Sequence, residues 1–369
     1  MTTGFVFHER YLWHDTGSAA AFIAAGGPVE PDAHVESPAS KRRLRGLLEV
    51  SGALDHLTAI TPREAEREEL LRFHTPEYVD RVEALSTAGH GDAGELAPVG
   101  ADSDAIARLA VGGCITAVDA VLDGTVDNAY ALTRPPGHHA ERDRGRGFCL
   151  YGNVALAVLH ARATRGLGRV AIVDWDVHHG NGTEQAFYDD PEVLTISLHQ
   201  DGNYPQNTGG VDDVGVGAGA GFNLNVPLPP GSGVGAYDAA FTDVVEPAIR
   251  AHRPELIVAA SGYDSGALDP MGRMLLHSEA YRSFTARVMT LAGELCDGRL
   301  VVSHEGGYSG AYVPFCGLAV VEQLAGVRTG VKDPFLSWVQ RLAYQDVQAH
   351  QQAVIDRAAR HVAGHAGGR

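Results

Sequence analysis

The segment Arg169-Val170-Ala171-Ile172-Val173-Asp174-Trp175-Asp176-Val177-His178-His179-Gly180 joins an apolar run to a dense polar cluster. The apolar part predicts a strand over 169–174, buried on both faces of a parallel sheet. Its polar groups then lie at the carboxyl end of that strand, where open α/β sheets place their active sites. The alternative to an active site is an acidic surface loop without a function. It is disfavoured because unpaired charge beside a buried strand is costly.

Two side chains of this segment suit one metal ion. Residues two apart on an extended backbone share a face, so Asp176 and His178 can converge. An oxygen and a nitrogen ligand make half of a typical zinc shell, and catalytic zinc commonly takes three protein ligands and leaves a position for water. The segment therefore predicts two of the ligands of a zinc site.

Similar apolar runs recur along the chain and alternate with helical patterns. This alternation predicts a βαβ rhythm and hence an α/β fold, with a central, mainly parallel sheet in one domain over 1–369. For the C-terminal part, the sequence predicts helices at about 332–364 and a frayed Gly-rich tail at 365–369. The expected strands are 128–132, 169–174, 193–197, 255–260 and 299–303, and the expected helices are 103–122, 153–165, 235–251 and 277–295.

Polar residues follow the other expected strands as well. Arg134-Pro135-Pro136-Gly137-His138-His139 presents two histidines from a rigid loop, and these suit acid/base chemistry because histidine titrates near neutrality. Asp264, after strand 255–260, is the natural third metal ligand. Tyr308 follows two glycines after strand 299–303, and Ser197-Leu198 ends strand 193–197. Five strand ends thus deliver polar groups to one rim of the sheet.

Composition limits the class of protein. The 369 residues carry 29 Lys and Arg against 46 Asp and Glu, a formal net charge of -17, which argues against nucleic-acid binding. The four cysteines form no Cys-x-x-Cys pair and fit buried thiols in a reducing compartment. The N-terminus has no apolar core of signal-peptide length, and no apolar run reaches the roughly 18 residues of a membrane helix. A cytoplasmic protein without a membrane anchor is expected, and its oligomeric state, including a homo-oligomer, stays open.

The motif set resembles one family. It comprises Pro135-Pro136-Gly137-His138-His139, Asp174-x-Asp176-x-His178-His179-Gly180, Ser197-Leu198-His199, Gly262-Tyr263-Asp264 and Glu305-Gly306-Gly307-Tyr308. Over roughly residues 4–330 the chain resembles the zinc-dependent histone deacetylase superfamily, and within it the bacterial class II-type histone-deacetylase-like amidohydrolases. Trp13-x-Asp15-Thr16-Gly17, Asn181 and Tyr312-Val313-Pro314-Phe315-Cys316-Gly317 are similar to that branch. The resemblance implies a three-layer, arginase/deacetylase-like fold.

The resemblance also implies a role for each catalytic residue. Asp176, His178 and Asp264 would bind one Zn²⁺ per chain. His139 would be the general base and acid, and His138 its buried companion, held by Asp174. Asn181 would lie behind His139, where a neutral amide in place of a carboxylate gives the base a lower pKa. Tyr308 would donate to the oxyanion.

The resemblance also implies residues that bind the substrate and a structural K⁺ ion. Phe148 and Tyr204 would wall a tunnel for an acyl-lysine side chain, and Asp92 would hold the substrate backbone at the rim. Gly147, Met271 and Gly307 are the remaining expected substrate-binding residues. The K⁺ ligands would be Asp174, Ser197 and the carbonyls of Asp176, His178 and Leu198, with a weaker second site near Phe187 and Val193.

The expected activity is removal of acetyl or related acyl groups from the ε-amino group of lysine in proteins or peptides, or from lysine-like amides. Acetylpolyamine deacetylation is the nearest alternative. Polyamine-selective relatives carry a Glu seven residues after the third zinc ligand, where this chain has Met271. An arginase-like ureohydrolase, which needs two metal ions, and a non-catalytic acyl-lysine-binding module are more distant alternatives. The natural substrate and its acyl length stay open.

Overall fold

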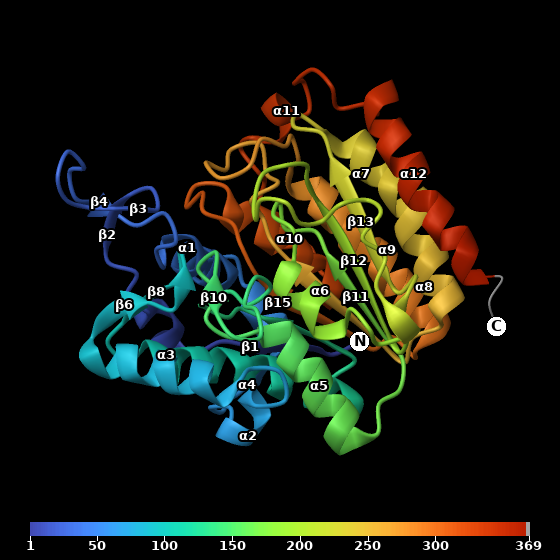
Figure 1. Ribbon diagram of the computed structural model, residues 1–369. Coiled ribbons are helices and arrows are strands. Elements are labelled where there is room, and N and C mark those ends of the chain that lie inside the picture. The colour runs from blue at the N-terminus through green and yellow to red at the C-terminus, as the bar shows by residue number, and fades with distance from the viewer. Residues whose placement is uncertain (367–369) are drawn as a thin grey trace.

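The computed structural model describes residues 1–366, and its centre is a parallel sheet of eight strands (Figure 1). Every neighbouring pair in this sheet is parallel. The strands, in spatial order, are β13 (Asn223–Leu228), β12 (Val193–Gln200), β11 (Val170–Asp174), β14 (Leu256–Ser261), β15 (Leu300–His304), β9 (Asn128–Ala131), β1 (Thr3–Val6) and β5 (Leu57–Ile60). The predicted α/β class and mainly parallel sheet are confirmed.

Helices cover both faces of the sheet and make it the middle of three layers (Figure 1). The side chains of β11 alternate between two cores: Ala171 and Val173 pack into one, Val170 and Ile172 into the other. One face carries α3 (Pro76–Ala88), α4 (Ser103–Leu122) and α5 (Asn153–Arg165). The other carries α1 (Ala39–Val50), α7 (Val234–Ala240), α8 (Glu246–His252), α9 (Ser278–Leu295), α10 (Val313–Ala325) and α12 (Ala349–Ala366).

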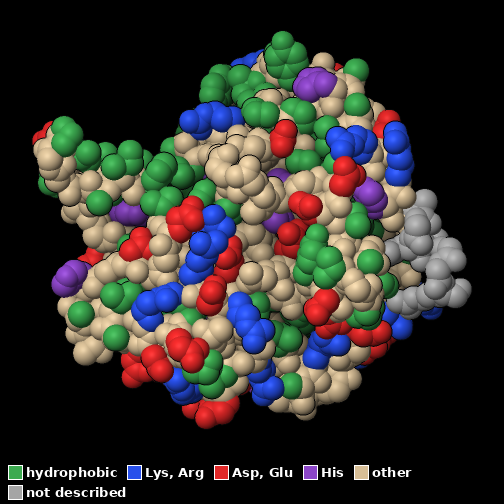
Figure 2. Space-filling view, in the orientation of Figure 1, with side chains coloured by type: hydrophobic (Ala, Val, Ile, Leu, Met, Phe, Trp, Pro, Cys, Tyr) green, Lys and Arg blue, Asp and Glu red, His purple; other side chains and the backbone are tan. Residues whose placement is uncertain are grey.

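Several short elements lie in the connections. A small sheet formed within residues 18–33 projects from the body of the molecule (Figures 1 and 2). It consists of β2 (Ser18–Ala20), β3 (Ile23–Ala24) and β4 (Asp32–Ala33). The others are α2 (Arg67–Leu70), β6 (His90–Asp92), β7 (Gly94–Glu95), β8 (Pro98–Gly100), β10 (Gly145–Arg146), α6 (Asn181–Phe187) and α11 (Leu336–Val339).

The structure gives more exact bounds for three predicted segments. The helix expected over 235–251 is α7 and α8 joined by a π-helical segment, Phe241–Val245. The helices expected over 332–364 are α11 and α12, with 340–348 between them. Helix α12 continues to Ala366, so residues 365 and 366 of the expected tail are helical, and 367–369 lie outside the described residues.

Helix α4 corrects an expectation. By its length and composition this helix could cross a membrane, whereas the sequence was expected to contain no such segment. Most of its side chains are buried, from Ile106 to Val121, and it packs against α5 and β9. Packing in the core of this fold therefore accounts for its apolar composition.

Candidate metal centre and active site

Three buried side chains converge at the carboxyl ends of β11 and β14. Asp176 and His178 follow β11, and Asp264 follows β14, its neighbour in the sheet. One ligand atom from each lies within 4.8 Å of the others. His178 Nδ1 is 3.0 Å from Asp176 Oδ1 and 3.1 Å from Asp264 Oδ2. The structure therefore brings the three predicted zinc ligands together.

Backbone amides orient these carboxylates. Asp264 Oδ1 accepts a hydrogen bond from Val177 N at 2.8 Å, and Asp176 Oδ2 accepts one from Gly306 N at 2.8 Å. Position 306 has to be glycine, because a Cβ there would overlap Asp264 Oδ2. The short side chain lets the loop after β15 approach the carboxylates closely.

The cluster fits a divalent cation. Asp264 Oδ2 is buried and makes no hydrogen bond of good geometry among the described residues, although His178 Nδ1 lies 3.1 Å away. Burial and the neighbouring Asp176 carboxylate raise the pKa of Asp264 to about 7, because a second negative charge is unfavourable there. Two carboxylate oxygens and an imidazole nitrogen are ligands that Zn²⁺ accepts.

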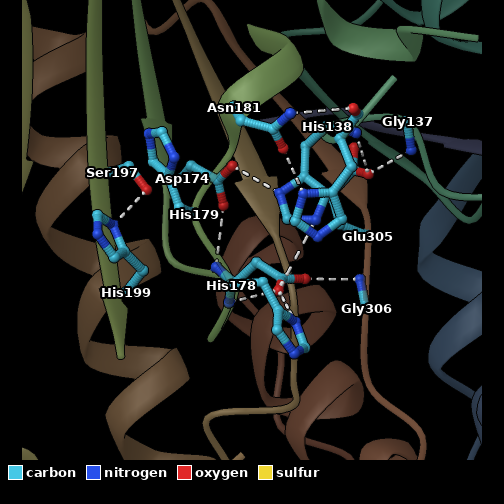
Figure 3. Close-up of polar contacts among 12 residues, drawn as sticks. Gly137, His138, Asp174, His178, His179, Asn181, Ser197, His199, Glu305 and Gly306 are labelled. Carbon is cyan, nitrogen blue, oxygen red and sulfur yellow. Dashed lines mark hydrogen bonds and ion pairs between the residues drawn. The ribbon is translucent and has the colours of Figure 1, made fainter. Parts of the chain in front are cut away.

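The loop after β9 delivers His138 and His139 beside this cluster. His138 Nδ1 lies 2.9 Å from Asp174 Oδ2, as predicted, and His139 Nδ1 lies 2.8 Å from Asn181 Oδ1. Figure 3 shows Glu305 beside Gly137 and His138 of this loop. Its Oε2 accepts hydrogen bonds from Gly137 N at 2.7 Å and His138 N at 3.2 Å. Glu305 thus anchors the backbone that carries both histidines.

The two histidines have opposite pKa shifts. Burial lowers the pKa of His138, but the carboxylates of Asp176 and Asp174 outweigh it and raise that pKa to about 10. Burial, and then the charges of His138 and His178, hold the pKa of His139 well below its usual range. A neutral imidazole beside a charged one is typical of an acid/base pair. The hydrogen bond with Asn181 acts in the opposite direction and raises the pKa of His139. A lower pKa with Asn181 than with a carboxylate at the same position stays a prediction.

Tyr308 lines the same pocket as His139 and lies in the loop after β15. Asp269 Oδ2 accepts hydrogen bonds from Tyr308 N at 2.7 Å and Ser309 N at 2.9 Å. Ser40 Oγ donates to the carbonyl of Gly307, whose φ of 118° favours glycine. Burial raises the pKa of Tyr308 well above its usual value, so its hydroxyl remains a proton donor. The sequence reasoning missed Asp269, because nothing in its sequence environment indicates a partner 39 residues away.

A pocket of about 270 Å³ leads to these groups. It contains Gly147, Phe148, Tyr204 and Met271, which were expected to contact substrate. The Tyr204 ring stands edge-on to His139, with centroids 5.1 Å apart. The full lining is Phe22, Leu96, His139, Gly147, Phe148, His178, Asn203, Tyr204, Pro270, Met271, Arg273 and Tyr308.

Two expected substrate-binding residues lie outside this lining. The Asp92 carboxylate accepts hydrogen bonds from Gly94 N at 2.8 Å and Ala97 N at 3.3 Å. Gly307 supports Tyr308 through its carbonyl. A direct contact of either residue with substrate stays a prediction.

The residues expected to bind K⁺ lie in and after β11 and β12, next to the three metal-binding residues. Asp174 pairs with Ser197 in the β11–β12 register, and both line a gap of about 10 Å³. Ser197 Oγ is 2.9 Å from His199 Nδ1 (Figure 3). Leu198 follows in β12, whereas Phe187 and Val193, at the weaker expected site, flank the turn from α6 to β12.

Comparisons with known proteins agree with this geometry. The family model of the histone deacetylase domain matches residues 34–324. A histone deacetylase-like amidohydrolase of Pseudomonas aeruginosa is 51% identical over 94% of this chain and 93% of its own length. A probable deacetylase of Archaeoglobus fulgidus is 38% identical over 88% of this chain and 87% of its own. The polyamine deacetylase HDAC10 of Homo sapiens is 37% identical over 84% of this chain and 46% of its own.

A solved structure extends the match to three dimensions. The HDA15 HD domain superposes with a TM-score of 0.85 at 33% identity, covering 99% of both chains. This match confirms the three-layer deacetylase fold. The family model alone spans well over half of the chain. The chain belongs to the histone deacetylase family.

Proposed function

We propose that this chain is a zinc-dependent amidohydrolase that removes acetyl groups from the ε-amino group of lysine residues or from lysine-like amides. One observation carries the proposal. One pocket is lined by Phe148 and Tyr204, by His178 of the three metal-binding residues, and by the neutral base His139 and the proton donor Tyr308. Deacetylase activity itself follows from family membership.

The residues divide the chemistry between them. A Zn²⁺ ion held by Asp176, His178 and Asp264 would lower the pKa of a water molecule to about 7 and polarise the amide carbonyl. His139 takes the proton of the attacking water and passes it to the departing amine. The Tyr308 hydroxyl donates a hydrogen bond to the carbonyl oxygen as negative charge develops there. The charged His138, held by Asp174, adds positive potential next to the metal-binding carboxylate of Asp176.

The pocket lining favours lysine-like substrates over polyamines. Among its lining residues there is no carboxylate to receive a second ammonium group, and Arg273 adds a positive charge. Met271, whose backbone nitrogen bonds to Asp269, stands where polyamine-selective relatives were expected to carry Glu.

A comparison of kcat/KM tests this preference. We expect the protein to prefer an acetyl-lysine peptide to N-acetylputrescine by at least about tenfold. Met271→Glu should raise kcat/KM for N-acetylputrescine, and the matched neutral variant Met271→Gln should not. A wild-type preference for acetylputrescine would identify the polyamine reaction instead.

Other expectations belong to the same proposal. Among the described residues, one group of side chains, Asp176, His178 and Asp264, could hold a metal ion. This supports a single catalytic zinc ion and not the two metal ions of an arginase-like enzyme. His139 and Tyr308 together support catalysis over simple acyl-lysine binding. We further propose a structural K⁺ at Asp174 and Ser197, a cytoplasmic location, and substrates that are acylated peptides or small acylated amines. The K⁺ site is tested by comparing the melting temperature of the protein in K⁺ with that in Na⁺, and we expect it to be higher in K⁺.

A further inference from the structure

Behind the general base lies a buried chain of polar groups that extends past Asn181. Asn181 Oδ1 is 2.8 Å from His139 Nδ1, and Asn181 Nδ2 donates to Glu141 Oε1 at 2.7 Å. The exposed fractions of Asn181 and Glu141 are 6% and 8%. The general base is thus linked to a carboxylate through one amide.

Glu141 determines which way the Asn181 amide faces. A carboxylate only accepts hydrogen bonds, so it requires the NH₂ end of the amide. The reverse orientation would place the amide oxygen 2.7 Å from a carboxylate oxygen, where two acceptors repel. A weaker contact, 3.4 Å from Asn181 Nδ2 to the His139 carbonyl, favours the same orientation.

The orientation of Asn181 in turn determines the tautomer of His139. An amide oxygen only accepts, so His139 Nδ1 must carry the ring proton and donate it. The lone pair of the neutral ring is then on Nε2, which makes no hydrogen bond with any residue in the described part of the chain, while the ring lines the pocket. This is the tautomer that can accept a proton from water.

Two arginines keep Glu141 ionised. Arg146 donates to Glu141 Oε1 and Arg144 to Oε2, each at 2.7 Å. Arg146 also pairs with Glu95 at 2.8 Å. These arginines outweigh the effect of burial and lower the pKa of Glu141, so it remains an acceptor at neutral pH.

We propose that Glu141 is a positioning residue for deacetylation: through Asn181 it holds His139 in the Nδ1–H tautomer and leaves Nε2 free as the base. The inference rests on the function proposed above for His139, but its structural part does not depend on the identity of the substrate. In this protein a neutral amide, that of Asn181, contacts the general base. The inference explains how the base still has the support of a carboxylate, because Glu141 holds Asn181.

The test compares four variants: Glu141→Ala, Asn181→Asp, the double variant E141Q/N181D, and the control Glu95→Gln. The control removes an ion pair of the same Arg146 without touching Asn181. Steady-state kinetics give kcat and KM with an acetyl-lysine peptide. ¹⁵N spectra of the zinc-loaded protein, labelled at histidine, report the tautomer, and a His139→Asn variant assigns the signal.

We expect Glu141→Ala to lower kcat about 10–100-fold with KM within about twofold, and to move the His139 signal away from the Nδ1–H pattern. Asn181→Asp sets two carboxylates against each other and should also lower kcat. E141Q/N181D restores a donor facing an acceptor, but the same amide NH₂ then also faces Arg146, so it should recover only part of the kcat lost in Asn181→Asp. Glu95→Gln should leave both readouts unchanged.

An unchanged tautomer in Glu141→Ala, or a double variant no better than Asn181→Asp, would overturn the inference. The double variant decides the question if Glu141→Ala does not fold. A wild-type protein that lacks deacetylase activity would contradict the proposed function, whereas the tautomer measurement would still test Glu141.

Discussion

His138 and His139 are neighbours in the chain, yet each has its own partner and its own protonation state. Asp174 bonds to His138, and Asn181 bonds to His139. The sequence predicts both pairings from a family resemblance, because all four residues belong to its motifs. It does not indicate Glu141, whose contact with Asn181 spans 40 positions and exists only in the folded chain.

Tyr308→Phe tests the proton donor. The ring and its edge contact with Phe148 remain, so folding and zinc content should be unchanged. Losing one donor to a developing oxyanion costs about 10²–10³ in kcat, and KM should change little. A trifluoroacetyl substrate, whose carbonyl is already activated, should suffer less. The control is Tyr281→Phe, which removes a buried hydroxyl without a hydrogen-bond partner among the described residues. A change confined to KM would mean that Tyr308 only shapes the pocket.

His74 makes stability depend on pH. Its Nδ1 lies 3.0 Å from the carbonyl of Glu141, and its Nε2 accepts from Gly152 N at 3.1 Å. Burial lowers its pKa from 6.5 to about 4, so between these values the unfolded chain binds a proton that the folded protein does not. Stability therefore falls as the pH falls through this window, by about 1.4 kcal/mol per unit from His74 alone.

We expect His74→Gln to flatten this dependence. The free energy of unfolding, measured by denaturant titration between pH 5 and 6, should have a slope about 1.4 kcal/mol per unit smaller than in wild type. Both proteins share any contribution from metal release, so the difference isolates His74. Parallel slopes would show that another group carries the effect.

At the scale of elements, uninterrupted apolar runs made the central strands predictable. Residues 170–174 and 256–261 are buried throughout and read as strands. Strand β13 was missed, because buried Asn223 and Asn225 interrupt its apolar pattern and bond to Glu184 instead. Strand β5 was missed because it lies at the sheet edge and no residue in it is fully buried.

The loops after β14 and β15 act together through Asp269. Its carboxylate binds the amides of Tyr308 and Ser309 with one oxygen and Met271 N with the other. Asp269→Asn replaces one acceptor by a donor and should cost about 1–3 kcal/mol of stability. A displaced Tyr308 should also lower kcat about 10–100-fold while zinc content is retained.

The matched control for Asp269 is Asp213→Asn. The Asp213 carboxylate also accepts a backbone amide, from Gly210, but in a surface loop away from the pocket. It should leave kcat unchanged. Wild-type kcat in Asp269→Asn would show that Tyr308 is held by its other contacts, such as the bond from Ser40 to Gly307.

At the scale of the molecule, the parallel sheet brings the catalytic groups to one edge. Asp176, Asp264, His139 and Tyr308 lie after β11, β14, β9 and β15, four adjacent strands. The sequence could predict this convergence, because the carboxyl ends of parallel strands share an edge. It could not predict the projecting sheet β2–β4, whose Phe22 joins the pocket lining, since short strands leave no periodic signal.

Zinc titration of the metal-free protein tests the central claim most directly, with acetyl-lysine peptide turnover and bound metal measured together. Turnover should rise in proportion to bound zinc and reach its plateau at one ion per chain, because Asp176, His178 and Asp264 form a single site. Asp264→Ala should neither bind zinc at this site nor gain turnover. Full turnover without metal, a requirement for two ions, or normal zinc content in Asp264→Ala would contradict the account.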